Sequence, residues 1–256
     1  MKPNDKKLPH YFLALAAAVL LGGCSTAPVQ KGKVIEEPYF SPQDVLVPGT
    51  TYLAEEIPDP WEGFNRTMYR FNYRFDKYIF LPAVRVYEAV LPDFAEQGIH
   101  NFFNNIRDIT TLINSVLQLS ADKSAITTQR LMWNTTVGLL GLVDVASKME
   151  LPRQQEDFGQ TLGHWGVGTG PYLVLPIYGP SNVRDTTGLL TDTVMMSAID
   201  PLDLQAATWR QVAYYTLYPL DMRAHIPFRY YETGSPFEYE FVRMLYTTKR
   251  QMDIEK

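Results

Sequence analysis

The single cysteine of this 256-residue chain is the residue whose type and position predict covalent chemistry. Cys24 follows an 11-residue apolar run, Tyr11 to Leu21, and the small pair Gly22-Gly23, and three lysines precede the run. A basic start, a short apolar run and small residues before a cleavage point are the parts of a secretory signal peptide. We therefore expect cleavage before Cys24 and acylation of its thiol, as in bacterial lipoproteins. A buried core cysteine, the alternative, leaves the preceding charges and apolar run unexplained.

Acyl chains on Cys24 predict a lipid anchor on the periplasmic side of a bacterial envelope. Each buried methylene contributes about 0.8 kcal/mol, so several chains anchor a protein stably. The apolar run is shorter than the ~20 residues that cross a bilayer, which makes a retained transmembrane anchor the weaker interpretation. Ser25 follows Cys24, and the absence of an acidic residue there favours the outer membrane. An acylated Cys24 leaves no free thiol for a disulfide, a metal or a nucleophile.

The expected mature chain is acidic. Removal of residues 1–23 takes away three lysines and one aspartate, which leaves 20 basic and 27 acidic residues and a net charge of −7. A negative surface repels the phosphate backbone of nucleic acids. We therefore predict no nucleic-acid partner.

Hydrolytic chemistry requires a nucleophile beside a base, and the mature chain offers few candidates. Ser181 lies in Gly-Pro-Ser-Asn-Val, which lacks the final glycine of a nucleophile elbow. No His-Glu-x-x-His or paired-cysteine spacing occurs, so we expect no metal site. His164 lies near Glu156 and Asp157 in sequence, and we favour a structural, hydrogen-bonded role for it over general-base catalysis. We predict a protein that is not an enzyme, with no catalytic residue and no cofactor; an envelope hydrolase is the less favoured alternative. The possible histidine bases are His100, His164 and His225.

Composition divides the chain into three segments. Residues 1–23 form the predicted signal peptide, and residues 24–58 form the lipidated N-terminus and a tether with five prolines. Proline-rich segments of this kind are extended spacers. Residues 59–256 are expected to form one compact domain that is long enough to bury a sizeable core.

The pattern of that domain predicts helices from its first residues. Asp59 is placed to cap a helix, and Glu62 occupies the capping-box position. Apolar side chains then recur every three or four residues until Pro82, where we expect the helix to end. We interpret this stripe as core-facing, with rings at a lipid interface as the alternative. Its members are Trp61, Phe64, Met68, Phe71, Phe75 and Tyr78.

Five further helices are expected, which predicts an all-α domain. They cover residues 83–91, 101–119, the stretch from Asp122 or Ser124 onward, 181–196 with Ser181 as its cap, and 204–217. A last helix is expected to begin at Ser235-Pro236-Phe237-Glu238, with Ser235 as its cap and apolar residues again on one face. The two predicted apolar faces are Phe102, Ile106, Ile109, Ile113 and Val116, and Phe237, Phe241, Met244 and Leu245.

Two weakly polar segments stand out from these helices. Residues 131–143 carry no charge and predict either a buried core helix or a segment immersed in one leaflet, where the glycines permit a re-entrant bend. Residues 158–180 are rich in glycine, but Pro171 and the lack of a Lys-Ser/Thr pair argue against a phosphate loop. We expect a bent loop or small hairpin there, with hinges at Gly166, Gly168 and Gly170.

Four motifs together resemble the MlaA (VacJ) family of outer-membrane lipoproteins, which maintain lipid asymmetry. The motifs are Asp59 to Arg66, Asn101 to Asn105, Asn134 to Gly138 with Asp144 to Ala146, and Asp157 to Tyr172 continuing through Gly179-Pro180 and Arg184-Asp185. The resemblance implies a ring-like, all-helical domain that lies in the periplasmic leaflet of the outer membrane. An amphipathic channel would admit phospholipid from the outer leaflet and pass it inward. The implied partners are the bilayer, a trimeric porin and a soluble periplasmic carrier that feeds an inner-membrane ABC transporter.

The two weakly polar segments are our candidates for the border of that lipid path. Acyl chains require an apolar wall, and a head group should pass neutral polar groups more easily than a fixed opposite charge. A structural or scaffolding lipoprotein with a dry core is the alternative function. The candidate channel residues are Thr135, Thr136, Leu140, Tyr172, Leu173, Val174, Leu175 and Ile177.

Overall fold

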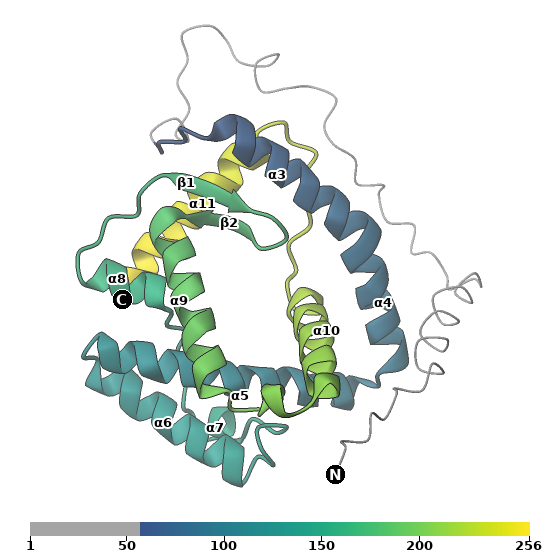
Figure 1. Cartoon of the computed structure of the whole chain (residues 1–256), viewed down its shortest axis with the longest axis vertical. Helices are drawn as coiled ribbons and strands as arrows, with labels where there is room; N and C mark the ends of the chain where they lie inside the picture. The colour runs from purple at the N-terminus through teal and green to yellow at the C-terminus, as the bar shows by residue number, and fades with distance from the viewer. Residues whose placement is uncertain (1–56) are drawn as a thin grey trace, which may run out of the picture. The chain divides into compact units, whose positions relative to one another are not determined.

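The computed structural model describes residues 57–256, which are mostly helical (Figure 1). The predictions for the signal peptide, for Cys24 and for nearly all of the tether lie outside the described residues. The elements are α3 (Glu62–Phe75), the π-helix η2 (Asp76–Phe80), α4 (Leu81–Val90), α5 (Asp93–Leu117), α6 (Ala121–Thr136), α7 (Val145–Lys148), α8 (Phe158–His164), β1 (Tyr172–Leu175), β2 (Gly179–Asn182), α9 (Val183–Ile199), the 3-10 helix η3 (Leu204–Ala206), α10 (Thr208–Ala224) and α11 (Glu238–Glu255). The expected helical class is confirmed.

The contacts between these elements close into a circuit (Figure 1). The chain runs from α3 through η2 and α4 into α5, and α5 packs against α8. Helix α8 packs against α9 and α11, both of these contact β2, and β1 packs against α3. Helix α10 packs against α4 and α5, while α6 lies along α5 and carries α7. The ring-like arrangement is therefore a property of the described contacts.

The first long helix does not end at Pro82 as the pattern predicted. The helical backbone continues from α3 through η2 to the end of α4 at Val90. Proline lacks the N–H that would bond to the carbonyl of Tyr78, and its ring crowds that carbonyl. The π-helical turn immediately before Pro82 widens the helix at this point, which accommodates the proline without a break.

Three side chains that the sequence predicted as helix caps do not cap their helices. Helix α3 begins at Glu62 without a side-chain cap, and the Asp59 carboxylate instead accepts from Asn65 Nδ2 at 2.7 Å and pairs with Arg243 Nη1 at 3.1 Å. Asn182, not Ser181, caps α9 by accepting from Asp185 N at 2.8 Å. Helix α11 begins at Glu238 without a side-chain cap from Ser235. Local spacing identified the helix starts but not the tertiary partners that compete for the same side chains.

The glycine-rich segment forms the expected small hairpin. Strands β1 and β2 pair antiparallel, with Tyr172 opposite Asn182 and Leu175 opposite Gly179. The turn between them places Ile177 at a φ of 67° and Gly179 at 94°. Buried Asn65 of α3 binds the free edge of β1, because its Nδ2 donates to Tyr172 O at 3.1 Å and its Oδ1 accepts from Val174 N at 2.8 Å. The hairpin is thereby fixed to the first helix.

The predicted inward stripe of α3 points the other way. Trp61, Phe64 and Phe71 are exposed, Phe71 by 44%, and Tyr78 of η2 is exposed as well. The buried face of α3 carries instead Asn65, Tyr69, Asn72 and Tyr73. The core-facing interpretation is therefore wrong for these four residues, whereas Met68 packs against the apolar core and Phe75 is half-buried.

Two more helices share this reversed arrangement. On α5 the predicted apolar face is half-buried or exposed, and the residues buried are Phe103, Asn105, Asp108, Thr111, Asn114 and Ser115. On α11 Phe241 and Leu245 are exposed, whereas Glu240 and Arg243 are buried. Buried polar groups are stable only when they are paired, so these helices are held by a polar interior.

A small apolar core remains where α3, β1 and α11 meet. Tyr239 contacts Tyr69 and Tyr172 edge to face, with ring centroids 5.7 and 6.1 Å apart. Val174 and Val242 complete this cluster. Within residues 57–256, no helix combines the length and the apolar character that crossing a membrane requires.

Candidate functional site

The uncharged segment 131–143 is a helix end followed by a tight turn. Helix α6 stops at Thr136, and Leu139 and Leu140 have φ values of 53° and 61°. A Cβ at Gly138 would lie 2.2 Å from Val143 O, so the turn requires glycine there. Leu140 is 66% exposed, which contradicts a buried core helix. The exposed apolar residues of the turn are Val137, Leu139, Leu140, Leu142 and Val143.

Two of the candidate channel residues border this turn. Thr135 and Thr136 are exposed at the end of α6, and Leu140 N donates to Thr135 O at 3.0 Å. Asn105 Nδ2 of α5 donates to Thr135 Oγ1 at 3.1 Å, and Thr136 Oγ1 donates to Met132 O at 2.6 Å. The structure thus brings Thr135, Thr136 and Leu140 together as apolar and neutral polar groups on one exposed turn.

The hairpin candidates divide according to the alternation of a strand. Tyr172 and Val174 are buried in the apolar core, Val174 completely, so they do not line an accessible path and that part of the prediction is wrong. Leu173 and Leu175 point to the other face of β1 and are half-buried, and Ile177 in the turn is 51% exposed. Successive side chains of a strand lie on opposite faces, which the apolar run of the sequence did not reveal.

The two candidate segments do not form one continuous wall. In Figure 1 the turn after α6 lies on the far side of α5 from the hairpin. Of the predicted hinges between them, Gly166 and Gly170 have positive φ values of 84° and 67°, while Gly168 does not. The backbone at Gly166 and Gly170 therefore favours glycine.

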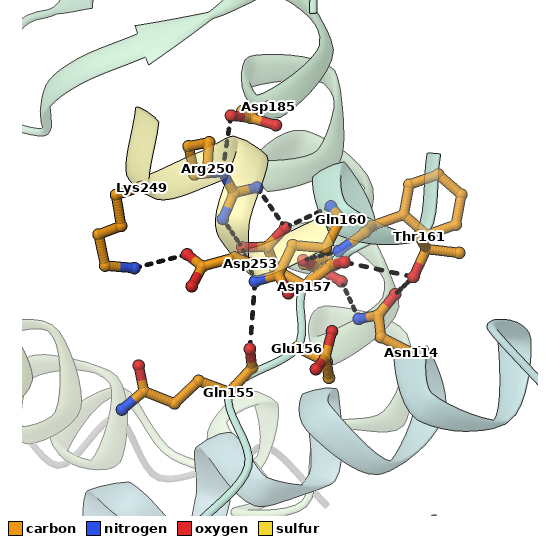
Figure 2. Close-up of polar contacts among 12 residues, drawn as sticks. Asn114, Gln155, Glu156, Asp157, Gln160, Thr161, Asp185, Lys249, Arg250 and Asp253 are labelled. Atoms are coloured by element: carbon orange, nitrogen blue, oxygen red, sulfur yellow. Dashed lines mark hydrogen bonds and ion pairs between the residues drawn. The ribbon is translucent and has the colours of Figure 1, made fainter. Parts of the chain in front are cut away.

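The polar interior is organised around arginines that each join several elements. Figure 2 shows Arg250 of α11 between Asp157, which caps α8, and Asp185 of α9. Its Nη1 and Nη2 donate to the two oxygens of Asp157 at 2.7 and 2.8 Å, and its Nε donates to Asp185 at 2.8 Å. One guanidinium thereby connects α8, α9 and α11 where the circuit closes.

These contacts control the protonation of the carboxyl groups. Burial works to raise the pKa of Asp157 and of Asp185, but the bonds and charge of Arg250 outweigh it and hold both pKa values below their usual range. Burial dominates at Asp192, whose pKa is raised although it accepts from Phe158 N at 2.9 Å. Asp157 and Asp185 are therefore ionised partners of Arg250 at neutral pH.

Two further arginines hold the other side of the circuit. Arg130 of α6 is 1% exposed and pairs with Asp108 and Asp144 at 3.2 Å each, which joins α6 to α5 and to the start of α7. Arg223 of α10 forms a two-point pair with Asp76 of η2 at 2.5 and 2.8 Å. The sequence showed these charges, but the residues of each pair lie too far apart in the chain for spacing to match them.

A histidine pair shares one buried carboxylate at the junction of α4, α5 and α10. Asp221 Oδ2 lies 3.0 Å from His100 Nδ1, Asp221 Oδ1 lies 3.6 Å from His225 Nδ1, and the two imidazole rings stack with centroids 3.6 Å apart. Possible ligand atoms of the three residues lie within 4.8 Å of one another. Imidazole nitrogens and a carboxylate can bind zinc, although the stacked rings would have to turn toward a shared ion. Only the Asp221–His225 spacing of four residues was visible in the sequence.

The two residues considered for hydrolysis, Ser181 and His164, make other contacts. The Ser181 hydroxyl bonds to Thr186 Oγ1 at 2.9 Å and to Asn182 O at 3.3 Å, so its described partners include no base. His164 is exposed at the end of α8 and contacts the ring of Trp165 edge to face. This geometry does not assemble a nucleophile and a general base.

Comparison with known proteins gives a consistent result. The family model described as MlaA lipoprotein matches residues 57–253. An uncharacterised protein of Rickettsia prowazekii is 43% identical over 148 residues, and this chain spans 57% of the length of that relative. The intermembrane phospholipid transport system lipoprotein MlaA of Shigella flexneri is 37% identical over 173 residues, which are 66% of each chain.

A solved structure is also similar. It was described under the words "Structural basis for maintenance of bacterial outer membrane lipid asymmetry", and the match has a TM-score of 0.62 at 31% sequence identity. The match covers 77% of this chain and 99% of the other. The similarity therefore extends over nearly the whole of the solved chain.

Proposed function

This chain belongs to the MlaA lipoprotein family, and we propose that it removes mislocalised phospholipid from the outer leaflet of a bacterial outer membrane. The lipid passes inward through an amphipathic channel to a soluble periplasmic carrier that feeds an inner-membrane ABC transporter. The relative in Shigella flexneri is named for intermembrane phospholipid transport, and the similar solved structure concerns outer-membrane lipid asymmetry. Both names support a transport role in preference to catalysis.

The observation that carries the proposal is the reversed arrangement of the helices. Exposed apolar area costs about 25 cal/mol per Å² in water, so the exposed apolar side chains of α3, α4 and α11 would be unfavourable on a protein surrounded by water. Lipid tails solvate such side chains without that cost. The paired polar groups of the interior, in turn, form a scaffold beside which a lipid head group can pass. Both properties suit a protein immersed in one leaflet.

The anchor follows from Cys24, whose acyl chains hold the mature chain to the membrane and which is joined to the domain by the proline-rich tether. We propose an outer-membrane location facing the periplasm. A trimeric porin is the proposed neighbour in the membrane, because family members associate with porins. No enzymatic step and no cofactor are part of this function.

We propose that the exposed residues of the two candidate segments contact the lipid. They are Thr135, Thr136 and Leu140 on the turn after α6, and Ile177 on the hairpin turn. Leu173 and Leu175 are secondary positions because they are half-buried. Tyr172 and Val174 are excluded as core residues.

A charge at an exposed position tests this function. We expect Leu140→Asp and Ile177→Asp to fold normally, since both side chains are exposed, but to block lipid passage, because an ionised carboxylate among lipid tails costs about 3 kcal/mol. The measurement is outer-leaflet phospholipid in cells lacking their own copy of the protein, together with the Tm of the purified variants. Leu140→Ser and Ile177→Ser are the matched neutral controls.

Full restoration of lipid asymmetry by both aspartate variants at normal abundance would contradict the proposed path. Val174→Asp is a separate control, because a charge in the apolar core should lower the Tm and the abundance. A structural lipoprotein predicts a third result, in which no variant changes the lipid distribution as long as the protein folds.

A further inference from the structure

Arg107 is an exception among the arginines of the interior. It is half-buried on α5, and within residues 57–256 its one polar contact is from Nη1 to Met222 Sδ at 3.5 Å, a weak acceptor. Arg229, also half-buried, uses the carbonyls of Ile226 and Phe228. The other buried or half-buried arginines of the described residues pair with carboxylates: Arg66, Arg130, Arg153, Arg184, Arg210, Arg223, Arg243 and Arg250.

The surroundings of Arg107 are aromatic and polar at the same time. Phe103, one turn earlier on the same face of α5, packs edge to face against Tyr214 and Tyr218 of α10, with ring centroids 5.9 and 5.2 Å away. Tyr214 and Tyr218 stack on each other at 5.3 Å. Arg107 therefore lies where α5 and α10 pack, beside rings that carry hydroxyl groups.

The hairpin adds a third phenol to this region. Tyr178 follows Ile177 in the turn and is 68% exposed, and Figure 1 shows that turn on the side of the circuit where α10 lies. Tyr178 interacts electrostatically with Tyr218 and with Arg107, so the three side chains lie near one another. Burial raises the pKa of Tyr214 to about 12, against the opposing charge of Arg107. Both phenols are protonated at neutral pH and can donate hydrogen bonds.

A free guanidinium beside phenol groups has a clear chemical complement. The planar fork of arginine binds two oxygens of a phosphate at once, and such charge-assisted bonds are about twice as strong as neutral ones. A phosphodiester monoanion has two oxygens without ester bonds, and phenol hydroxyls can donate to either. Met222 and Phe103 give the same place an apolar side that suits acyl chains.

We propose that Arg107 binds the phosphate of a glycerophospholipid during its passage, with the hydroxyls of Tyr178 and Tyr218 as further donors. This inference rests on the proposed transport function and names the group by which the lipid is recognised. It also replaces the expectation that the path contains no fixed charge. Because Arg107 is only half-buried, water competes for the phosphate, and the lipid is released as well as bound.

The site distinguishes lipids by their phosphate and not by their tails. A glycerophospholipid and a diacylglycerol can carry identical acyl chains, but only the first has the anion that Arg107 would bind. The wild-type protein should therefore retain phospholipid over diacylglycerol, and this preference should depend on Arg107 more than on the apolar residues of the path.

Competitive loading of the full-length lipoprotein tests the assignment. The purified protein is incubated in detergent with equal amounts of phosphatidylglycerol and diacylglycerol of matched chains, and bound lipid is measured by mass spectrometry. We expect Arg107→Gln to lose about tenfold in bound phosphatidylglycerol relative to diacylglycerol, and Arg107→Lys to recover part of it. Arg85→Gln, which removes an exposed arginine of α4, is the matched control and should leave the ratio unchanged.

The outcomes separate this inference from the proposed function. A wild-type protein that binds neither lipid contradicts the transport function itself. A wild-type protein that prefers phospholipid, together with an Arg107→Gln variant of equal Tm and equal preference, overturns the role of Arg107 alone. If inorganic phosphate raises the Tm of the wild-type protein but not of Arg107→Gln, and the lipid ratio is the same in both, the site takes free phosphate and the lipid assignment is wrong.

Discussion

Arg250 shows how one residue can hold several elements of this protein. Its two partners are Asp157 at the start of α8 and Asp185 of α9; Asp185 also pairs with Arg184 at 3.0 Å. We expect Arg250→Gln to lower the free energy of unfolding by about 2 kcal/mol, because it removes three charge-assisted hydrogen bonds, one of them to the buried Asp185 carboxylate. Lys249→Gln is the control, since Lys249 forms an exposed pair with Asp253 and should change stability by less than about 0.5 kcal/mol. Chemical unfolding in detergent measures both.

The same contacts predict a pH dependence with a definite sign. The pKa values of Asp157 and Asp185 are lower in the folded protein than in the unfolded chain, where they are near 3.9. Their contribution to stability is therefore complete above about pH 4 and is lost as the pH falls through the folded values. Unfolding measured between pH 6 and pH 3 should show a smaller acid loss in Arg250→Gln than in the wild type. Equal pH profiles would show that the carboxylates do not depend on Arg250.

At this scale the sequence predicted residue types better than residue partners. The resemblance included Asp157 and the hairpin, but Arg250 lies 93 positions from Asp157, and no spacing rule connects them. The sequence also could not predict that Arg107 has no carboxylate partner among the described residues, because this depends on which carboxylates pair with the other arginines in the fold. Asp59 was placed correctly at a helix start but was assigned the wrong acceptor role.

The contact between α8 and α9 depends on glycine on both helices. A Cβ on Gly188 would lie 2.2 Å from the backbone nitrogen of Gly159, so the two helices would have to separate. We expect Gly188→Ala to lower the free energy of unfolding by about 3 kcal/mol through this overpacking. Gly63→Ala on α3 is the control, because no atom lies within 4 Å of the added Cβ and alanine favours a helix. A loss in Gly188→Ala no larger than in Gly63→Ala would argue against close packing here.

The sequence predicted the amphipathic helices correctly, but it did not predict which face of each helix is buried. Spacing of three and four residues identified α3, α5 and α11 as amphipathic, and the structure has helices at all three places. The assumption that Phe71 faces inward came from proteins surrounded by water. Amphipathicity defines two faces, and the solvent decides which one is buried. The hairpin was predicted because glycine permits its turn. Which of Leu173 and Val174 is buried depends on how the strand alternates its side chains, and the sequence did not show that.

The whole chain is expected to reach its membrane through Cys24. We expect Cys24→Ala to keep its signal peptide and to be absent from outer-membrane fractions, because the enzyme that cleaves lipoprotein precursors acts on a lipidated cysteine. The measurement is the mass of the N-terminal peptide together with fractionation of the envelope. Ser25→Ala is the control, since it leaves the cleavage point unchanged. A Cys24→Ala variant that is cut before residue 24 would rule out lipoprotein processing.

The closed circuit of contacts also orders the events of folding. Arg66 of α3 bonds to Glu240 of α11 across 174 positions of the chain, and Asp59 bonds to Arg243 across 184. Contacts so distant in sequence form slowly, because the intervening chain must first be brought together. Every helix can form beforehand, but the contacts that join the first helix to the last cannot form until the final residues are available. On the proposed export route, the chain would expose its apolar faces before the circuit closes, so we expect it to depend on a chaperone that prevents aggregation.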